Sequence, residues 1–257
     1  MALAEGHPPP GTDDDLCFAV RRGDLAAVKA HLAAGAQVDL SGYGVKAYKG
    51  AKHAEYHGCS ALCFAALVPD RTECLQALID ARADVSLKVG CAEGSALFYA
   101  CRAGHSEAAC ALIRAGARFN DDTRLVRQCL YDTAWTWGDA VPTRADLEGK
   151  PIGWRPPPPE GAKERSVQGR LDCLRQLCTA GLNLNRPLAQ GGVTSGMTPL
   201  MMVAMSNSPA ALRIMLDASP MPDLLVKDHS GKRAHEYAFP RSECRAMLVD
   251  AGGGALE

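Results

Sequence analysis

One stretch of the sequence decides the fold: ALFYACRAGH at residues 96–105, followed by ALIRAGA at residues 111–117. Leucine and alanine recur in it at i, i+3 and i+4, which predicts two short helices that each have one apolar face. Gly116 follows the second helix, where a glycine suits a left-handed C-cap. A single pair of such helices cannot cover its apolar face, so neighbouring pairs must stack and share a core.

The same frame recurs along the chain. It returns as DLCFAVRRGD (15–24) with LAAGA (32–36), and as SALCFAA (60–66) with LIDARADV (78–85). A third copy opens with TPL at 198–200, and weaker copies run over 131–134 with 177–181 and over 234–238 with 247–252. The equivalent positions after the second helix are Gly35, Arg82, Gly116, Gly181, Ser219 and Gly252.

This pattern resembles the ankyrin repeat, TPLHxAAxxGHxxVVxLLLxxGADVN, whose unit is about 33 residues long. The equivalent positions lie 47, 34, 65, 38 and 33 residues apart, which fits six repeats with two long insertions. The resemblance implies an all-α ankyrin-repeat solenoid of about six helix-turn-helix repeats over residues 13–254, after a flexible N-terminal tail at 1–12. Arg82 and Ser219 replace the usual glycine, so we expect those helix ends to fray or to cap differently, at about 1 kcal/mol each.

The first insertion, at about residues 41–56, falls where an ankyrin solenoid carries its β-hairpin finger beside the concave face. It holds tyrosines among lysines: Tyr43, Lys46, Tyr48, Lys49, Lys52 and Tyr56. One interpretation is a contact loop for an acidic or phosphorylated partner, with the tyrosines as anchors. A second is a solvated loop that its lysines keep soluble. A third is an anion or lipid-headgroup binder, whose binding would weaken strongly with salt.

The second insertion, at about residues 139–168, lies between the two helices of the fourth repeat, on the edge opposite the fingers. It contains GKPIGWRPPPPE at 149–160. Four consecutive prolines favour a polyproline II ligand with Trp154 and Arg155 as flanking anchors. The alternative is a stiff spacer that packs Trp154 back on the solenoid.

Ankyrin domains usually bind partners through the finger tips and through exposed inner-helix positions, notably the two before the GH pair. The resemblance carries these positions over to Arg21, Arg22, Leu67, Val68, Arg102, Ala103, Thr136, Trp137, Met205 and Ser206. We expect Leu67, Val68, Trp137 and Met205 to be exposed in a row and to form an interaction patch. The competing interpretation is that Trp137 covers the base of the second insertion.

The sequence shows none of the constellations that enzymes need. It has no GxSxG, HExxH, Walker or kinase motif, and its seven histidines are dispersed. In the repeat, Cys63 takes the histidine position and Cys101 an alanine position, while Cys74 and Cys173 take the valine position and Cys178 a leucine position. We interpret these cysteines as small core residues rather than zinc ligands. His105 takes the GH position, where the histidine of an ankyrin repeat stabilises loops and the start of a helix. We therefore predict no catalysis, no cofactor and no metal.

Composition sets the class of partner and the compartment. With 28 Lys and Arg against 29 Asp and Glu, the chain is not expected to bind nucleic acid. It has no run of about 20 apolar residues and no secretory signal in MALAEGHPPPGTDDD. Its eleven cysteines suggest no disulfide framework. We predict a cytoplasmic protein in a reducing environment, without a membrane span.

Together these observations predict a non-catalytic scaffold or adaptor that binds a protein partner through its concave face and extended finger, either as a monomer or within a complex. The alternative is a structural or targeting subunit of a large assembly that docks through the Pro-rich loop.

Overall fold

The computed structural model describes residues 13–39, 59–68, 70–89, 93–120, 122, 124–130, 162–187 and 196–252. Within these ranges the chain forms twelve helices in six pairs and no strand. The pairs are α1 (Asp13–Arg22) with α2 (Leu25–Ala33), α3 (Ala61–Leu67) with α4 (Thr72–Asp80), α5 (Ala96–Ala103) with α6 (Ser106–Arg114), α7 (Arg124–Leu130) with α9 (Ala162–Thr179), α10 (Pro199–Ser206) with α11 (Pro209–Leu216), and α12 (Ala234–Tyr237) with α13 (Glu243–Gly252). The expected tail, the finger insertion and residues 139–161 of the second insertion lie outside the described residues.

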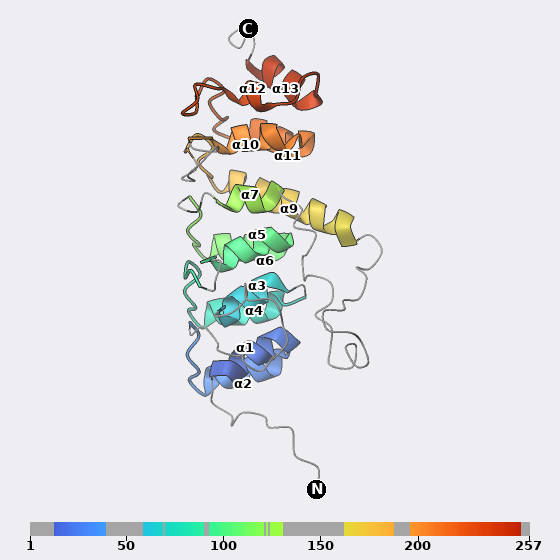
Figure 1. Cartoon of the computed structure of the whole chain (residues 1–257). Coiled ribbons are helices and arrows are strands. Elements are labelled where there is room, and N and C mark those ends of the chain that lie inside the picture. Colours follow the sequence, from blue (N-terminus) through green and yellow to red (C-terminus); the bar gives the residue numbers. More distant parts are fainter. Residues whose placement is uncertain are drawn as a thin grey trace, which may run out of the picture.

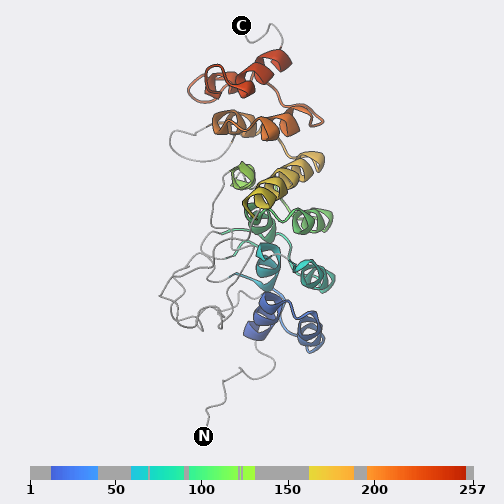
Figure 2. The same cartoon turned by 90° about the vertical axis from the view of Figure 1, so that its right-hand side faces the viewer.

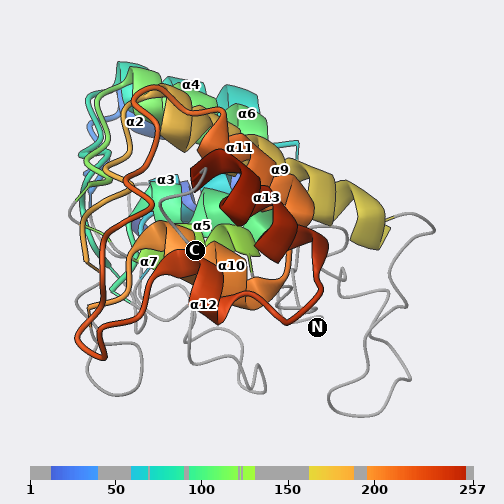
Figure 3. The same ribbon diagram turned by 90° about the horizontal axis from the view of Figure 1, so that it is seen from above.

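The six pairs stack in chain order, with α1 and α2 at one end of the stack and α12 and α13 at the other (Figure 1). Seen from above and from the side, the helices form two rows (Figures 2 and 3). The inner row is α1, α3, α5, α7, α10 and α12, and the outer row is α2, α4, α6, α9, α11 and α13. Each helix contacts the next helix of its own row. The expected all-α solenoid of six repeats is therefore confirmed.

One core runs through all six repeats, from Leu16 to Leu248. Small side chains let the helices approach closely, and nine cysteines are buried among them. Burial raises the pKa of the Cys63 thiol to about 12 and that of Cys178 to about 11. These thiols are therefore neutral near pH 7 and pack as small apolar groups, as the repeat positions predict.

Most outer helices end in the same left-handed cap. Gly35, Gly116 and Gly181 have φ values of 84°, 86° and 88°. Arg82 takes the same conformation, with φ 63°, and its N–H donates to the Ile79 carbonyl while Ala83 donates to Leu78. The expectation that Arg82 caps differently is wrong, because this pair of hydrogen bonds satisfies two end carbonyls that would otherwise lack partners.

The end of α11 does cap differently, as expected at Ser219. Its C-cap, Asp217, is right-handed like Ala34 at the end of α2. Ala218 then donates to the Met215 carbonyl over 3.2 Å, as Gly35 does to Leu32. The difference is that neither Ala218 nor Ser219 has a positive φ, so this helix ends without the left-handed residue that the other caps use.

The fourth repeat differs from the expected register. The helix that takes its inner position is α7, which begins at Arg124, seven residues before the copy expected at 131–134. Leu125, Val126 and Cys129 are buried and form the apolar face that joins the core. The segment between the two helices of this repeat is thus 131–161, and residues 162–168, expected in the insertion, belong to α9.

Along the finger edge, side chains link each of the first four repeats to the next by accepting backbone hydrogen bonds. The acceptors are Asp39 from Asp84 N (2.8 Å), Ser86 from Arg118 N (2.9 Å), Asn120 from Asn183 N (2.8 Å) and Asn185 from Asp223 N (2.7 Å). We call this series the finger-edge ladder. It continues across the fourth repeat even though residues 131–161 separate the helices of that repeat.

The opposite edge carries the turns between the two helices of each pair. In two of its joints, a side chain at the start of an outer helix reaches back to the preceding repeat. The Arg71 guanidinium donates through Nε and Nη2 to the Arg21 carbonyl over 3.4 Å. His105 Nδ1 donates to the Ala66 carbonyl over 3.0 Å. His105 therefore has the structural role expected of the GH position.

The joint between the third and fourth repeats is built from backbone. The long helix α9 runs unbroken through Gly169, and its main chain lies against the α5–α6 turn at Gly104. A Cβ atom at Gly169 would lie 1.9 Å from the Gly104 carbonyl oxygen. Glycine at 169 is required because it lets the two chains approach this closely.

Candidate functional site

The candidate site is the set of side chains that the inner row leaves incompletely buried. In α1 from Leu16 onward and in α3, α5, α7 and α10, they are Phe18, Arg21, Arg22, Phe64, Arg102, Arg124, Arg127, Gln128, Leu130, Met205 and Ser206. We call this set the inner-row surface. It holds five arginines, two phenylalanines and no acidic residue. The sixth inner helix, α12, is not part of this set and carries an exposed Glu236.

At the α1 end, an aromatic ring and a cation form a pair. Phe18 is 47% exposed although it is large and apolar. The guanidinium carbon of Arg22, four residues later on the same helix face, lies 5.3 Å from the centroid of the Phe18 ring. This cation–π geometry presents a flat apolar face and a charge together, which is the kind of contact that anchors a partner.

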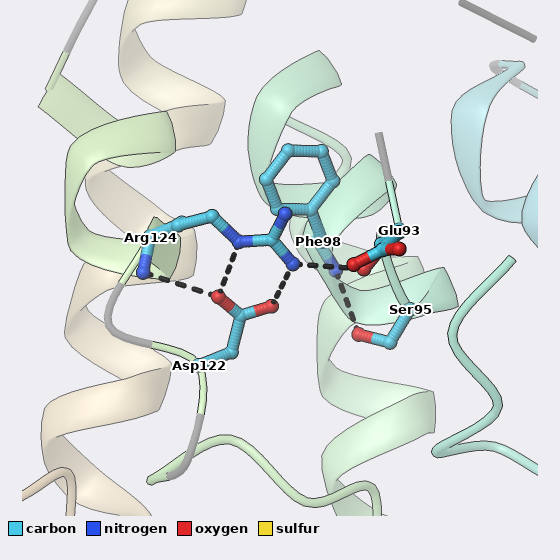
Figure 4. A network of polar contacts seen from close by, with 5 residues as sticks. All are labelled: Glu93, Ser95, Phe98, Asp122 and Arg124. Carbon is cyan, nitrogen blue, oxygen red and sulfur yellow. Dashed lines mark hydrogen bonds and ion pairs between the residues drawn. The ribbon is translucent and has the colours of Figure 1, made fainter. Parts of the chain in front are cut away.

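At the α7 end, Arg124 joins the third and fourth repeats (Figure 4). Its Nε lies 2.9 Å from Oδ1 of Asp122, whose side chain is 4% exposed, and its Nη2 lies 2.9 Å from Oδ2. The same Nη2 donates to the Glu93 carbonyl over 2.8 Å, and the guanidinium stacks 4.8 Å from the Phe98 ring centroid. Hydrogen bonding to Asp122 raises the pKa of Arg124. Its charge is already matched within the protein, so Arg124 is a structural tie.

Comparison with known proteins places part of the chain in a family. The family model described as ankyrin repeats (3 copies) matches residues 16–123. These residues are similar to the ankyrin-repeat family. Ankyrin repeats generally mediate protein–protein interaction, and the family is typically non-catalytic.

Two solved structures are similar to this chain. EF0377, an ankyrin repeat protein, superposes with a TM-score of 0.54 at 18% identity and covers 88% of this chain and 90% of its own. The human ASB11 ankyrin repeat domain gives a TM-score of 0.42 at 20% identity and covers 96% and 99%. The likeness to EF0377 supports the fold alone. No curated protein matches the sequence.

The ankyrin frame places some of the predicted binding residues on the inner-row surface. Arg22 is exposed, and Arg21 and Arg102 are half-buried. Arg102 is the one residue of α5 that is not buried. Met205 is half-buried and packs against the core.

Leu67 and Val68 are buried, so the expectation that they are exposed in the interaction patch is wrong. Their exposed fractions are 6% and 8%. The reason is that α3 packs between α1 and α5 and against α4, and Leu67 belongs to the shared core. Phe64, three residues earlier than Leu67, is the one residue of α3 that is not buried.

Ten predicted contact residues lie outside the described residues: Tyr43, Lys46, Tyr48, Lys49, Lys52, Tyr56, Thr136, Trp137, Trp154 and Arg155. Sequence reasoning missed Phe18, Phe64 and Arg127. A signal for Phe18 exists, because a residue four positions before the expected Arg22 shares its helix face. Arg127 was missed because it lies on α7 (Arg124–Leu130), whereas the inner helix of the fourth repeat was expected at 131–134.

The described residues show no grouping of three His, Cys, Asp or Glu side chains that would suit a metal ion. None of the described helices is long and apolar enough to cross a bilayer.

Proposed function

We propose that this protein is a non-catalytic adaptor that binds a segment of a partner protein along its inner-row surface. The observation that carries the proposal is the composition of that surface. Arginine, aromatic residues and methionine are enriched at protein interfaces, whereas Lys, Glu, Asp, Ser and Ala are depleted there. The inner-row surface holds all three favoured kinds of residue, and Ser206 is its one member of a disfavoured kind.

The outer helices of the first five repeats give a composition with which the inner-row surface can be compared. Its incompletely buried side chains include four acidic residues and four basic ones: Glu73, Asp80, Glu107, Asp172, Lys29, Arg114, Arg175 and Arg213. This balanced mixture is typical of a solvated surface. Both rows belong to one stack, so the stack itself does not require the composition of the inner row.

We extend the proposal to the finger at 41–56, as a second contact beside the inner-row surface, and to a cytoplasmic location. The nine buried thiols support the location, because reduced cysteines persist in a reducing compartment. Such an adaptor works either as a monomer or inside a complex.

Site-specific photo-crosslinking tests the proposal. We would place p-benzoylphenylalanine at Phe64, on the inner row, and at Gln76, an exposed outer position of the same repeat. A circular dichroism melt shows that both variants remain folded. We expect crosslinked partner protein from the Phe64 position and none from Gln76. Equal crosslinking from both positions would contradict the proposal.

Deletion variants separate the main proposal from the docking alternative. We would capture partners with the intact chain and with chains that lack residues 41–56 or 139–161. We expect crosslinking at Phe64 to survive deletion of 139–161. If that deletion abolishes it, the Pro-rich segment is the docking element.

A further inference from the structure

We propose that three buried thiols, those of Cys101, Cys129 and Cys173, form an oxidisable site at the joint between the third and fourth repeats. A peroxide oxidises the site to a disulfide between Cys101 and one of the other two thiols, and this bond ties the third repeat covalently to the fourth. We call the three side chains the thiol cluster. None of them belongs to the inner-row surface, so the site does not depend on which partner that surface binds.

The thiol cluster lies where three helices meet. Cys101 belongs to α5, Cys129 to α7 and Cys173 to α9, and each of these helices contacts the other two (Figure 1). The exposed fractions of the three residues are 0%, 3% and 0%. Cys101 is in the third repeat and the other two are in the fourth, so a disulfide from Cys101 to either one crosses the same joint.

Cys101 is the central member of the cluster. Its thiol hydrogen-bonds with those of both Cys129 and Cys173. Sulfur atoms in hydrogen-bonding contact are already neighbours, so a disulfide, in which they lie about 2.0 Å apart, forms by side-chain rotation and a small approach of the helices. The two hydrogen bonds, together with burial, raise the pKa of the Cys101 thiol well above its usual range. This thiol therefore stays protonated while the joint is closed.

The first step of the oxidation follows from this protonated state. The thiolate is the form that attacks a peroxide, so the step requires a local opening of the joint in which Cys101 loses its proton. The thiolate attacks one oxygen of hydrogen peroxide, the O–O bond breaks, and the products are a sulfenic acid and hydroxide. The proton released from Cys101 neutralises the hydroxide to water.

The second step uses a neighbouring thiol. The thiol of Cys129 or Cys173 attacks the sulfenic sulfur, and its proton leaves with the sulfenic hydroxyl group as a second water. Two thiols and one hydrogen peroxide thus give one disulfide and two waters, and two electrons pass from sulfur to oxygen. Because two thiols stand beside Cys101, its sulfenic acid is trapped before a second peroxide oxidises it further. In a reducing compartment such a disulfide is transient, and thiol reductants restore the reduced cluster.

The joint that the disulfide closes has no short covalent link of its own. Residues 131–161 separate α7 from α9, and the third repeat meets α9 through the backbone contact of Gly104 with Gly169. A bond from Cys101 fixes α5 against α7 or α9, so the parts of the solenoid on either side can no longer move apart there. Oxidation therefore stiffens the stack at this one joint.

The other buried cysteines differ from the cluster. The Cys63 thiol lies near Cys59, but its own hydrogen bonds are with Ser60. Burial raises the pKa of Cys74 and Cys244, and among the described residues no thiol contributes to this rise. Cys74 and Cys244 serve as controls, because they share the burial of the cluster without its thiol neighbours.

Peptide mapping of the oxidised full chain tests the inference. The protein is treated with hydrogen peroxide, denatured, alkylated with N-ethylmaleimide, digested with trypsin and analysed by mass spectrometry without reduction. We expect disulfide-linked peptides that join Cys101 to Cys129 or to Cys173, whereas Cys74 and Cys244 should remain alkylated. The oxidised protein should also unfold at a higher urea concentration than the reduced protein, because the disulfide restricts the unfolded chain. Dithiothreitol should reverse this shift.

Cys101→Ala is the matched variant, because Cys101 takes an alanine position of the repeat and the smaller side chain suits the core there. We expect this variant to lose the disulfides at Cys129 and Cys173 and to lose the shift in urea. Cys74→Ala, which removes another buried thiol, should keep both. Circular dichroism melts establish that both variants are folded.

Each other outcome overturns the inference. If Cys101 is still alkylated after treatment with excess peroxide, or is oxidised to sulfinic acid, the neighbouring thiols do not trap it. If Cys129 and Cys173 still form disulfides in the Cys101→Ala chain, Cys101 is not the central member. If Cys74 or Cys244 forms disulfides as readily as Cys101, the reaction reports general unfolding. A lower urea midpoint after oxidation would mean that the bond distorts the joint instead of closing it.

Discussion

Two joints on the turn edge of the stack are built in opposite ways. Between the second and third repeats, a side chain makes the link, because His105 reaches across to the Ala66 carbonyl. Between the third and fourth repeats, the main chain of α9 lies directly on the α5–α6 turn, with Gly169 against Gly104. A side-chain link loses only its own hydrogen bond when it is altered. A backbone contact has no flexible part, so any added atom must move a helix.

The largest effect is expected for Gly169→Ala. In an exposed helix this change stabilises by about 1 kcal/mol. Here the new Cβ would lie 1.9 Å from the Gly104 carbonyl oxygen, so we expect a loss of about 3 kcal/mol in the free energy of unfolding. Urea denaturation followed by circular dichroism measures it. Gln168→Ala, at the exposed neighbouring position, serves as the control and should be near neutral. If Gly169→Ala raised the free energy of unfolding, the close backbone contact between Gly169 and Gly104 would be refuted.

Gly104→Ala probes the same joint from the other side. Gly104 has φ 76°, and a Cβ there would lie 2.7 Å from the Ser166 carbonyl oxygen. Gly116 has φ 86°, but a Cβ added there would meet no atom within 4 Å. We expect Gly116→Ala to cost about 1 kcal/mol from its backbone conformation alone, and Gly104→Ala about 2 kcal/mol. Equal costs in the same urea experiment would mean that the contact adds nothing to the cost of the backbone conformation.

The side-chain joint at His105 should be weaker. His105→Ala removes the hydrogen bond from Nδ1 to the Ala66 carbonyl, which is 3.0 Å long and partly buried. We expect a loss of about 1 kcal/mol in the free energy of unfolding, the usual net value of such a bond. A loss as large as that of Gly169→Ala would erase the distinction between the two joints.

Arg71→Ala should have the smallest effect. The Arg71 guanidinium donates to the Arg21 carbonyl over 3.4 Å in a partly exposed position, so we expect a loss of about 0.5 kcal/mol. The guanidinium also lies 2.6 Å from where a Cβ at Gly23 would be. Gly23→Ala should therefore cost less in the Arg71→Ala background than in the parent chain, which a double-mutant cycle measures.

The periodic features of the fold could be predicted from the sequence, and the features set by neighbouring repeats could not. Leucine and alanine at helical spacing predict the helix pairs, and Gly35, Gly116 and Gly181 mark their ends correctly. The inner helix of the fourth repeat was predicted in the wrong place for two reasons. An insertion separates the two helices of this repeat. In addition, Leu125, Val126 and Cys129 form the apolar face of the helix without matching the residues of the repeat motif.

The candidate site shows the same division. Arg22 and Arg102 follow from their places in the repeat and are incompletely buried. Leu67 and Val68 occupy equivalent places but are buried. Their burial could not be predicted from one repeat, because it depends on how α3 packs against α1, α4 and α5. The same holds for Gly169, whose purpose depends on Gly104, 65 positions away in the chain.

The fourth repeat joins α7 to α9 through packing and not through a short turn. The two helices contact each other, and both contact α5, while Asn120 and Asn183 bridge their repeats on the finger edge. Covalent continuity through 131–161 is therefore not what keeps the two ends of the solenoid together. We therefore expect that two polypeptides divided within 131–161 would reassemble into one solenoid.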